Sequence, residues 1–327
     1  MRRLLASGLA LALAILAVTT LARTPEAQTT ARVLEACAPG KETIDARALP
    51  AAVVTPERCP VAGREIKDGE VGSVVPPAGE SVHAEVLTNS GAEELEIGRR
   101  EDGTVELAFV GEDAEASGGR LARSGSPGEC SDRKYTPGDR RVPRNSPLNY
   151  EINLASTPSE LRAGDAVDAI RRAGARVTRT KNNCHMGDRV PAGLVYDGKT
   201  GRGTNLEGLS CVSSDEFSVV AFGDLPSGIL AATCNWDDGF DNTIASDIKI
   251  NKQDVRWTTS PRSRSCRGMY DLEGIMTHER GHTFGMGHVS ETEHGNLTMS
   301  TNINGTCQMA ERSLGRGDVL GLGRKYD

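Results

Sequence analysis

Three histidines and one glutamate near the carboxyl end of the chain have the spacing of a hydrolytic metal site. His278, Glu279, His282, Gly285 and His288 stand in the order H-E-x-x-H-x-x-G-x-x-H. Residues four apart project from one face of a helix, so His278 and His282 can present two ring nitrogens to one ion. Glycine accepts the positive φ of a sharp turn, and a turn at Gly285 would bring His288 back as a third ligand. The pattern therefore predicts one zinc ion with three imidazole ligands.

Glu279 follows the first ligand and is not needed to bind the metal. Zinc with three protein ligands keeps a fourth position open for water and lowers the pKa of that water to about 7. Glu279 is therefore the candidate general base. Asp271 can cap a helix in which Leu272, Ile275 and Met276 form a core-facing side, so the motif has the helical context that it requires. The alternative is that the histidines are surface residues of an ordinary helix.

The extended motif resembles the signature of the metzincin clan of zinc endopeptidases, which pairs it with a methionine turn beneath the metal. Met299 is the candidate for that methionine, Met309 is the second candidate, and an ordinary core methionine is the alternative. Three other stretches resemble the catalytic domain of the matrixins, the matrix metalloproteinase family. They are residues 228–232 (edge strand), residues 247–258 (inner strand and following tryptophan) and residues 314–326 (closing helix, with Asp318 at its acidic position).

The resemblance covers residues 147–326 and implies an α+β fold. We expect a metzincin-type domain, with a mixed twisted sheet, an active-site helix and a C-terminal helix, preceded by a small β-rich region. The expected partner is a protein or peptide substrate, bound as an extended strand along residues 228–232 by β-augmentation. Matrixins usually hold a second, structural zinc through several histidines, but only His83, His185 and His294 lie outside the motif, so we expect one zinc. Val289 stands where matrixins usually have a serine, and Thr301 stands where astacins place an extra tyrosine ligand.

The amino-terminal residues and the charge predict an exported protein. Arg2 and Arg3 precede an apolar run that ends near Leu21, which is typical of a signal peptide over residues 1–22, with cleavage after Ala22 or Ala27. A membrane anchor is the alternative, although the run is short for a membrane span. The net charge of −7 becomes −9 without the leader and offers no basic surface for nucleic acid or anionic membranes. We expect a secreted, extracellular monomer without stable membrane association.

The chain has eight cysteines and no C-x-x-C pair, which favours disulfides in an exported protein. We expect Cys37 to pair with Cys59 and the other six to pair within or close to the protease domain. The alternative for Cys59, in an Arg-Cys-Pro string, is the cysteine switch of matrixin propeptides, which blocks the zinc.

A shift in composition divides the chain near residue 125. Residues 23–128 are expected to be a β-rich region, with a hairpin around residues 102–103 and a glycine-rich linker at 118–128. Arg120 and Arg123 in that linker suit proteolytic nicking. The region is either a removable propeptide, which would make the protein a zymogen, or a permanent accessory domain. Residues 129–327 are expected to form the protease domain.

Several elements are predicted within residues 129–327. A capping-box pattern at residues 157–160 is expected to open a helix that runs to about residue 175, with Ala166, Ile170 and Ala173 on its buried side. Strands are expected near residues 148–154, 176–180, 193–196, 217–222, 229–234 and 247–250. The acidic runs at 197–205 and 237–241 are either calcium sites or solvated loops.

The predicted function is peptide-bond hydrolysis, with Glu279 taking a proton from water and passing it to the leaving amine. The alternative is an inactive secreted zinc-binding or adhesion module on a metalloprotease scaffold. A pure binder has little use for a base beside the ion, so Glu279 favours the enzyme.

Overall fold

The computed structural model describes residues 33, 35–38, 40–49, 55, 57, 59–110, 126–303 and 305–327. The predicted signal peptide and most of the predicted linker, with Arg120 and Arg123, lie outside these residues. None of the helices in the described ranges is long and apolar enough to cross a membrane.

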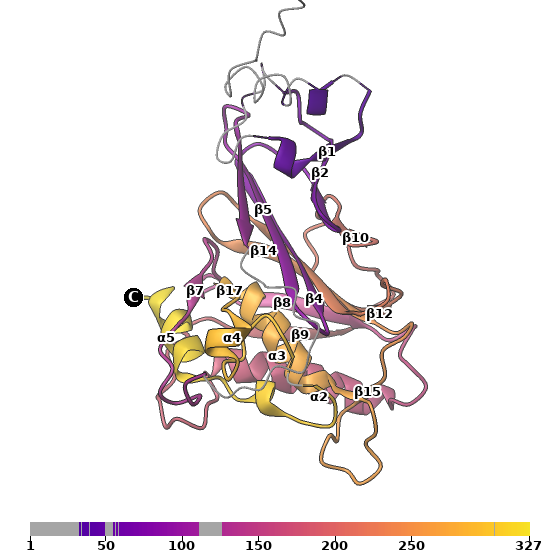
Figure 1. The fold of residues 1–327 in the computed structure, drawn as a ribbon, viewed down its shortest axis with the longest axis vertical. Helices are drawn as coiled ribbons and strands as arrows, with labels where there is room; N and C mark the ends of the chain where they lie inside the picture. Colours follow the sequence, from indigo (N-terminus) through magenta and orange to yellow (C-terminus); the bar gives the residue numbers. More distant parts are fainter. Residues whose placement is uncertain are drawn as a thin grey trace, which may run out of the picture.

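An eight-stranded sheet forms the centre of the fold (Figure 1). Its strand order is β6-β5-β4-β13-β14-β12-β8-β9. The strands from β14 to β9 are mutually parallel, whereas β13 runs antiparallel to β14 and to β4. The bounds are β4 Glu80–Thr88, β5 Ala92–Arg99, β6 Val105–Val110, β8 Leu148–Asn153, β9 Leu194–Lys199, β12 Val219–Gly223, β13 Ile229–Asp237 and β14 Thr243–Asn251.

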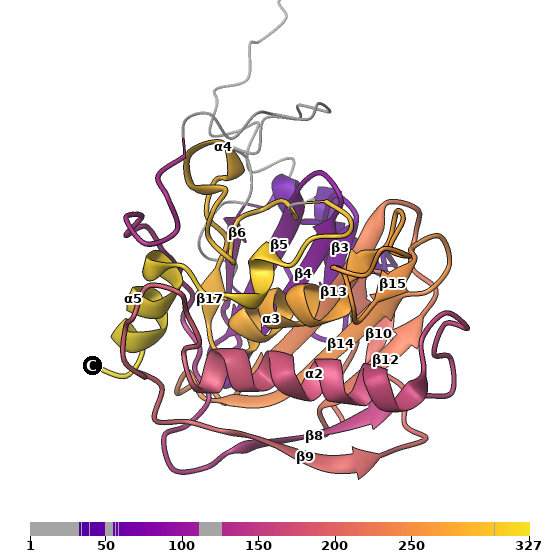
Figure 2. The ribbon, with the colours of Figure 1, turned by 90° about the horizontal axis from the view of Figure 1, so that it is seen from below.

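Two helices, α2 (Ala163–Thr178) and α3 (Leu272–Thr283), lie against one face of this sheet (Figure 2). Ala166, Ile170 and Ala173 of α2 are fully buried there, as predicted. After α3 the chain forms the short helix α4 and then the closing helix α5, beside the carboxyl terminus. The remaining bounds on this side are α4 Glu291–His294, α5 Arg316–Arg324, the 3-10 turn Ala310–Arg312, and strands β7 Thr136–Pro137, β15 Trp257–Thr258, β16 Tyr270–Asp271 and β17 Met286–Gly287.

A smaller sheet covers the other face, with the strand order β1-β2-β3-β11-β10. The core between the two sheets combines side chains from early and late parts of the chain, such as Ile66 and Val82 with Trp236. The fold is therefore α+β, and residues 33–110 share two sheets and one core with residues 126–327. The bounds are β1 Thr43–Asp45, the 3-10 turn Ala46–Ala48, β2 Glu65–Asp68, β3 Val71–Val74, β10 Leu206–Glu207 and β11 Ser210–Cys211.

Most of the predicted elements are present. The hairpin around residues 102–103 is confirmed as β5 and β6, and the strands expected near 148–154, 193–196, 217–222, 229–234 and 247–250 are β8, β9, β12, β13 and β14. The predicted helix start was wrong, because the Thr157 hydroxyl donates to the Leu154 carbonyl and Glu160 accepts from the Trp257 backbone. The strand expected at 176–180 was also wrong, because α2 continues to Thr178.

Strand β13 contains the segment that was expected to be a free edge. The structure corrects this expectation, because β4 pairs with β13 from the register Ile229↔Thr88 to Asp237↔Ser81. The strand therefore lies inside the sheet, between β4 and β14.

The eight cysteines form four disulfides, so the expected Cys37–Cys59 pair is confirmed. The other pairs, Cys130–Cys184, Cys211–Cys234 and Cys266–Cys307, lie within residues 126–327, also as expected. The cysteine-switch alternative was wrong, because the Cys59 sulfur is bonded to Cys37 and is not free to bind a metal.

Candidate metal centre

Helix α3 presents the first two histidines from a fully buried face. The Asp271 side chain accepts a hydrogen bond from the Gly274 backbone at 3.1 Å, and so caps the helix as predicted. After the helix, Gly285 has φ +79°, and a Cβ built on it would lie 1.8 Å from the Arg140 carbonyl oxygen. This position accepts only glycine, and the turn that it permits leads the chain back to His288.

The three rings converge on one point through their Nε2 atoms. His278 Nε2 lies 2.9 Å from His288 Nε2 and 3.1 Å from His282 Nε2. Two carbonyl oxygens fix the rings, since His278 Nδ1 lies 2.7 Å from the Thr298 oxygen and His282 Nδ1 lies 2.9 Å from the Met286 oxygen. A carbonyl only accepts, so each Nδ1 carries the proton and each Nε2 keeps a lone pair for a metal.

The surroundings keep two of the rings in the ligand form. Burial, reinforced by the neighbouring His288, lowers the pKa of His278 to about 3. Burial also holds the pKa of His282 well below its usual range. Both imidazoles are therefore neutral near pH 7, as metal ligands must be.

Met299 packs directly against helix α3. A Cβ built on Gly281 would lie 2.2 Å from the Met299 sulfur, so the glycine makes room for this side chain. Asp318 of α5 holds the backbone there, because its carboxylate accepts from the Thr298 amide at 2.9 Å and the Met299 amide at 3.3 Å. Met299 therefore packs against helix α3 at Gly281, next to Thr298, whose carbonyl fixes His278.

Glu279 projects from α3 toward strand β13. Its Oε2 accepts a hydrogen bond of 2.5 Å from the Thr233 hydroxyl, and its Oε1 accepts none from any described residue. Burial raises the pKa of Glu279 above its usual range, while the hydrogen bond from Thr233 opposes that rise. A carboxylate with a raised pKa and one free oxygen is suited to take up a proton.

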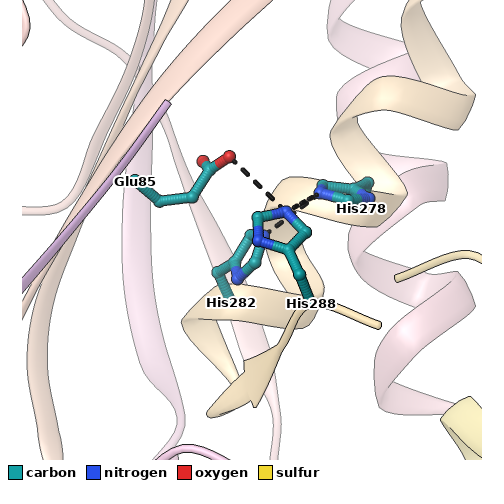
Figure 3. Close-up of side chains that lie close together, drawn as sticks. All are labelled: Glu85, His278, His282 and His288. Carbon is teal, nitrogen blue, oxygen red and sulfur yellow. Dashed lines mark hydrogen bonds and ion pairs between the residues drawn. The ribbon is translucent and has the colours of Figure 1, made fainter. Parts of the chain in front are cut away.

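Glu85 of strand β4 faces the three rings, and no sequence pattern predicted this contact. Figure 3 shows its carboxylate pointing from β4 toward the rings, with Oε1 3.7 Å from His288 Nε2. One ligand atom from each of Glu85, His278, His282 and His288 lies within 4.8 Å of the others. The fourth position, which was expected to be open, therefore has a protein carboxylate beside it.

Glu94 and His83 complete the surroundings of the site from the same early strands. Glu94 Oε1 contacts His288 Nδ1 and accepts from the His288 backbone amide at 3.2 Å. Glu94 Oε2 lies 3.5 Å from His83 Nε2, and the His83 ring stacks against His282 at 5.7 Å between centroids. Glu94 thus orients the third histidine, as carboxylates behind metal-binding histidines commonly do.

The donor set fits a zinc ion. Three imidazoles are ligands that zinc prefers, and ligand nitrogens around tetrahedral zinc are separated by about 3.3 Å, close to the separations found here. Both Glu85 oxygens and one Glu279 oxygen are buried without a hydrogen-bond donor among the described residues. Unpaired buried carboxylate oxygens are costly, and a cation between them and the rings would offset that cost.

The two acidic runs considered for calcium are not part of this site. Asp238 accepts from the backbone and side chain of Asn242 and from the Phe240 amide. Neither run contributes to the three groups of described residues that could hold a metal. Calcium binding stays a prediction.

No known protein-family model matches the chain, and a search of curated proteins finds no match either.

Proposed function

We propose that this protein is a secreted zinc-dependent endopeptidase of the metzincin type, similar to the matrixins. The observation that carries the proposal is the convergence of His278, His282 and His288 through their Nε2 atoms, with Glu279 beside them on the same helix. Met299 beneath the helix and Asp318 behind it support the resemblance, as does the position of α3 against a mixed sheet. Four disulfides agree with export.

The chemistry is peptide-bond hydrolysis. Zinc held by the three rings would polarise the scissile carbonyl and lower the pKa of the attacking water. Glu279 takes the proton from that water through its free oxygen and later passes it to the leaving amine. Thr233 holds the other oxygen and so fixes the carboxylate against strand β13. Strand β13 supplies backbone donors and acceptors for an extended substrate when its edge is free.

The proposal is tested with protein cut inside residues 111–125 at an inserted site for a sequence-specific protease. Wild type, Glu279→Gln and the control Glu293→Gln, a change at an exposed glutamate of α4, are loaded with zinc and compared for casein cleavage. We expect wild type and the control to cleave casein, to stop with a chelator and to recover with added zinc. Glu279→Gln should keep its zinc and lose at least about 100-fold in rate, because general-base catalysis contributes about that much. Equal rates in Glu279→Gln and wild type would contradict the proposal.

A second candidate function is a non-catalytic zinc-binding module, and Glu85 is the observation that favours it. Three histidines and a carboxylate make four protein ligands, which is the closed set of a structural zinc site. The same experiment separates the two functions, since a structural site would bind zinc and cleave nothing in the cut or the uncut form.

A further inference from the structure

Strand β4 occupies the edge of β13 that the proposed function assigns to substrate. The two strands pair antiparallel over the whole of β13. A peptide added to this edge would need the same backbone donors and acceptors that β4 now uses. Binding of substrate and binding of β4 to β13 therefore exclude each other.

The register of this pairing places Glu85 opposite the catalytic machinery. Glu85 pairs with Thr233, and the Thr233 hydroxyl is bonded to Glu279. The side chain of Glu85 is fully buried, accepts no hydrogen bond from any described residue, and points toward the three rings (Figure 3). A residue of β4 thus stands at the point along β13 where the proposed function requires a scissile peptide and a water.

We infer that residues 33–110 are an inhibitory segment, in which β4 blocks the substrate edge and the Glu85 carboxylate acts as a removable fourth ligand of the metal. This inference rests on the proposed function. The residue that would block the metal is thus a glutamate on a sheet strand. The cysteine of the Arg-Cys-Pro string, Cys59, cannot block it because its sulfur lies in a disulfide.

The disulfides agree with a segment that can be released. Cys37–Cys59 lies within the early part of the chain, and the other three pairs lie within residues 126–327. No disulfide joins the two parts, and this holds for all eight cysteines of the chain. After a cut within residues 111–125, noncovalent contacts alone would hold residues 33–110 in place: the β4–β13 and β3–β11 pairings, the shared core and polar contacts such as that of Glu94 with His288.

Access to the metal is measured first, on uncut protein and without turnover. Cobalt-substituted wild type, Glu85→Gln and the control Glu93→Gln are titrated with acetohydroxamate while the visible absorption of the metal is recorded. Glu93 is an exposed glutamate of β5, so its substitution makes the same charge change in the same sheet away from the rings. We expect all three proteins to bind one metal, because the three histidines are intact.

Glu85→Gln should bind acetohydroxamate at least about tenfold more tightly than wild type or Glu93→Gln. A site that is open in only a few per cent of molecules weakens apparent affinity in proportion to that fraction. Equal affinity in the three proteins would overturn the assignment of Glu85 as a ligand.

Access of substrate is measured second, by cutting residues 111–125 and separating the products by size-exclusion chromatography. Casein cleavage should rise at least about 100-fold over uncut protein if fewer than about one in a hundred molecules has β13 open before the cut. The activity should appear in fractions that have lost residues 33–110. Uncut Glu85→Gln should still fail on casein, since β4 remains on β13.

Two results would overturn the inhibitory role and leave the proposed function standing. They are casein cleavage by uncut wild type at the rate of the cut protein, and full activity in cut fractions that retain residues 33–110. Failure to bind metal in every form would instead count against the proposed function itself.

Discussion

Replacement of Gly281 by alanine tests the packing of Met299 against helix α3. The new Cβ would meet the Met299 sulfur at 2.2 Å and its terminal methyl at 3.0 Å, where about 3.5–4.0 Å is normal. Met299 is 1 % exposed and packed among Phe284, Met286 and Val319, so it cannot move away freely. Overpacking of this kind costs about 1–3 kcal/mol, and the better helix propensity of alanine offsets up to ~1 kcal/mol. We expect Gly281→Ala to destabilise the fold by about 1–2 kcal/mol.

The assay is urea unfolding followed by circular dichroism, with zinc removed by a chelator so that metal binding does not contribute. The control is Gly164→Ala in α2, where the added Cβ meets nothing within 4 Å and the change should be neutral or stabilising by up to ~1 kcal/mol. Met299→Ala alone should cost about 2–5 kcal/mol. In the Met299→Ala background the clash is gone, so Gly281→Ala should no longer destabilise.

The two substitutions should therefore be coupled by about 1–3 kcal/mol. Strictly additive costs would refute the claim that Met299 fills the space beside Gly281. A second readout is zinc affinity, since displacement of Met299 disturbs Thr298, whose carbonyl fixes His278. Gly281→Ala should bind zinc more weakly than Gly164→Ala.

Three further predictions concern the turn, a buried acid and the carboxylate behind the third histidine. Gly285→Ala should lower the free energy of unfolding in urea by more than ~3 kcal/mol, because it adds a clash with the Arg140 carbonyl to the strain of positive φ. The control Gly208→Ala has a similar φ and open space around the new Cβ, so it should cost about 1 kcal/mol. Burial raises the pKa of Asp237 from 3.8 to about 7, so the folded state binds more protons than the unfolded state between these values, and stability falls as pH rises through this window. Asp237→Asn should remove up to about 4 kcal/mol of the stability difference between pH 4 and pH 8, and an unchanged difference would contradict the shift. Glu94→Ala should weaken zinc binding by about 10- to 100-fold in a competition titration, and unchanged affinity would show that Glu94 does not orient the third histidine.

The sequence predicted the convergence of the three histidines and the helix that carries two of them, because local geometry determines both. A four-residue spacing puts two histidines on one helix face wherever the helix lies, and Asp271 and Gly285 mark the ends of the element. The inner strands and the disulfide between Cys37 and Cys59 also followed from local patterns.

The contribution of strand β4 to the site could not be predicted in this way. His83 and Glu85 alternate with Val82, Ala84 and Val86, a pattern that usually means polar residues facing water on one side of a strand. Here that side faces α3, because β4 pairs with β13, which lies about 150 residues later in the chain. The spacing of residues within either strand does not predict a pairing with a strand so distant in sequence.

The capping-box pattern failed for a related reason. Thr157 and Glu160 have the right types and spacing for a helix start, but Glu160 accepts from the Trp257 backbone, a residue distant in sequence. Because of these tertiary hydrogen bonds, the helix begins at Ala163 and not at the predicted start.

Whether the three histidines bind zinc is tested by the zinc content of protein purified without chelator, for wild type, His282→Asn and His185→Asn. His185 is exposed and lies outside the metal-ligand groups of the described residues, so its substitution is the matched control. We expect one zinc per chain in wild type and in His185→Asn, and loss of that zinc in His282→Asn. Full zinc content in His282→Asn, or no zinc in correctly folded wild type, would contradict the claim that the three histidines form a metal centre.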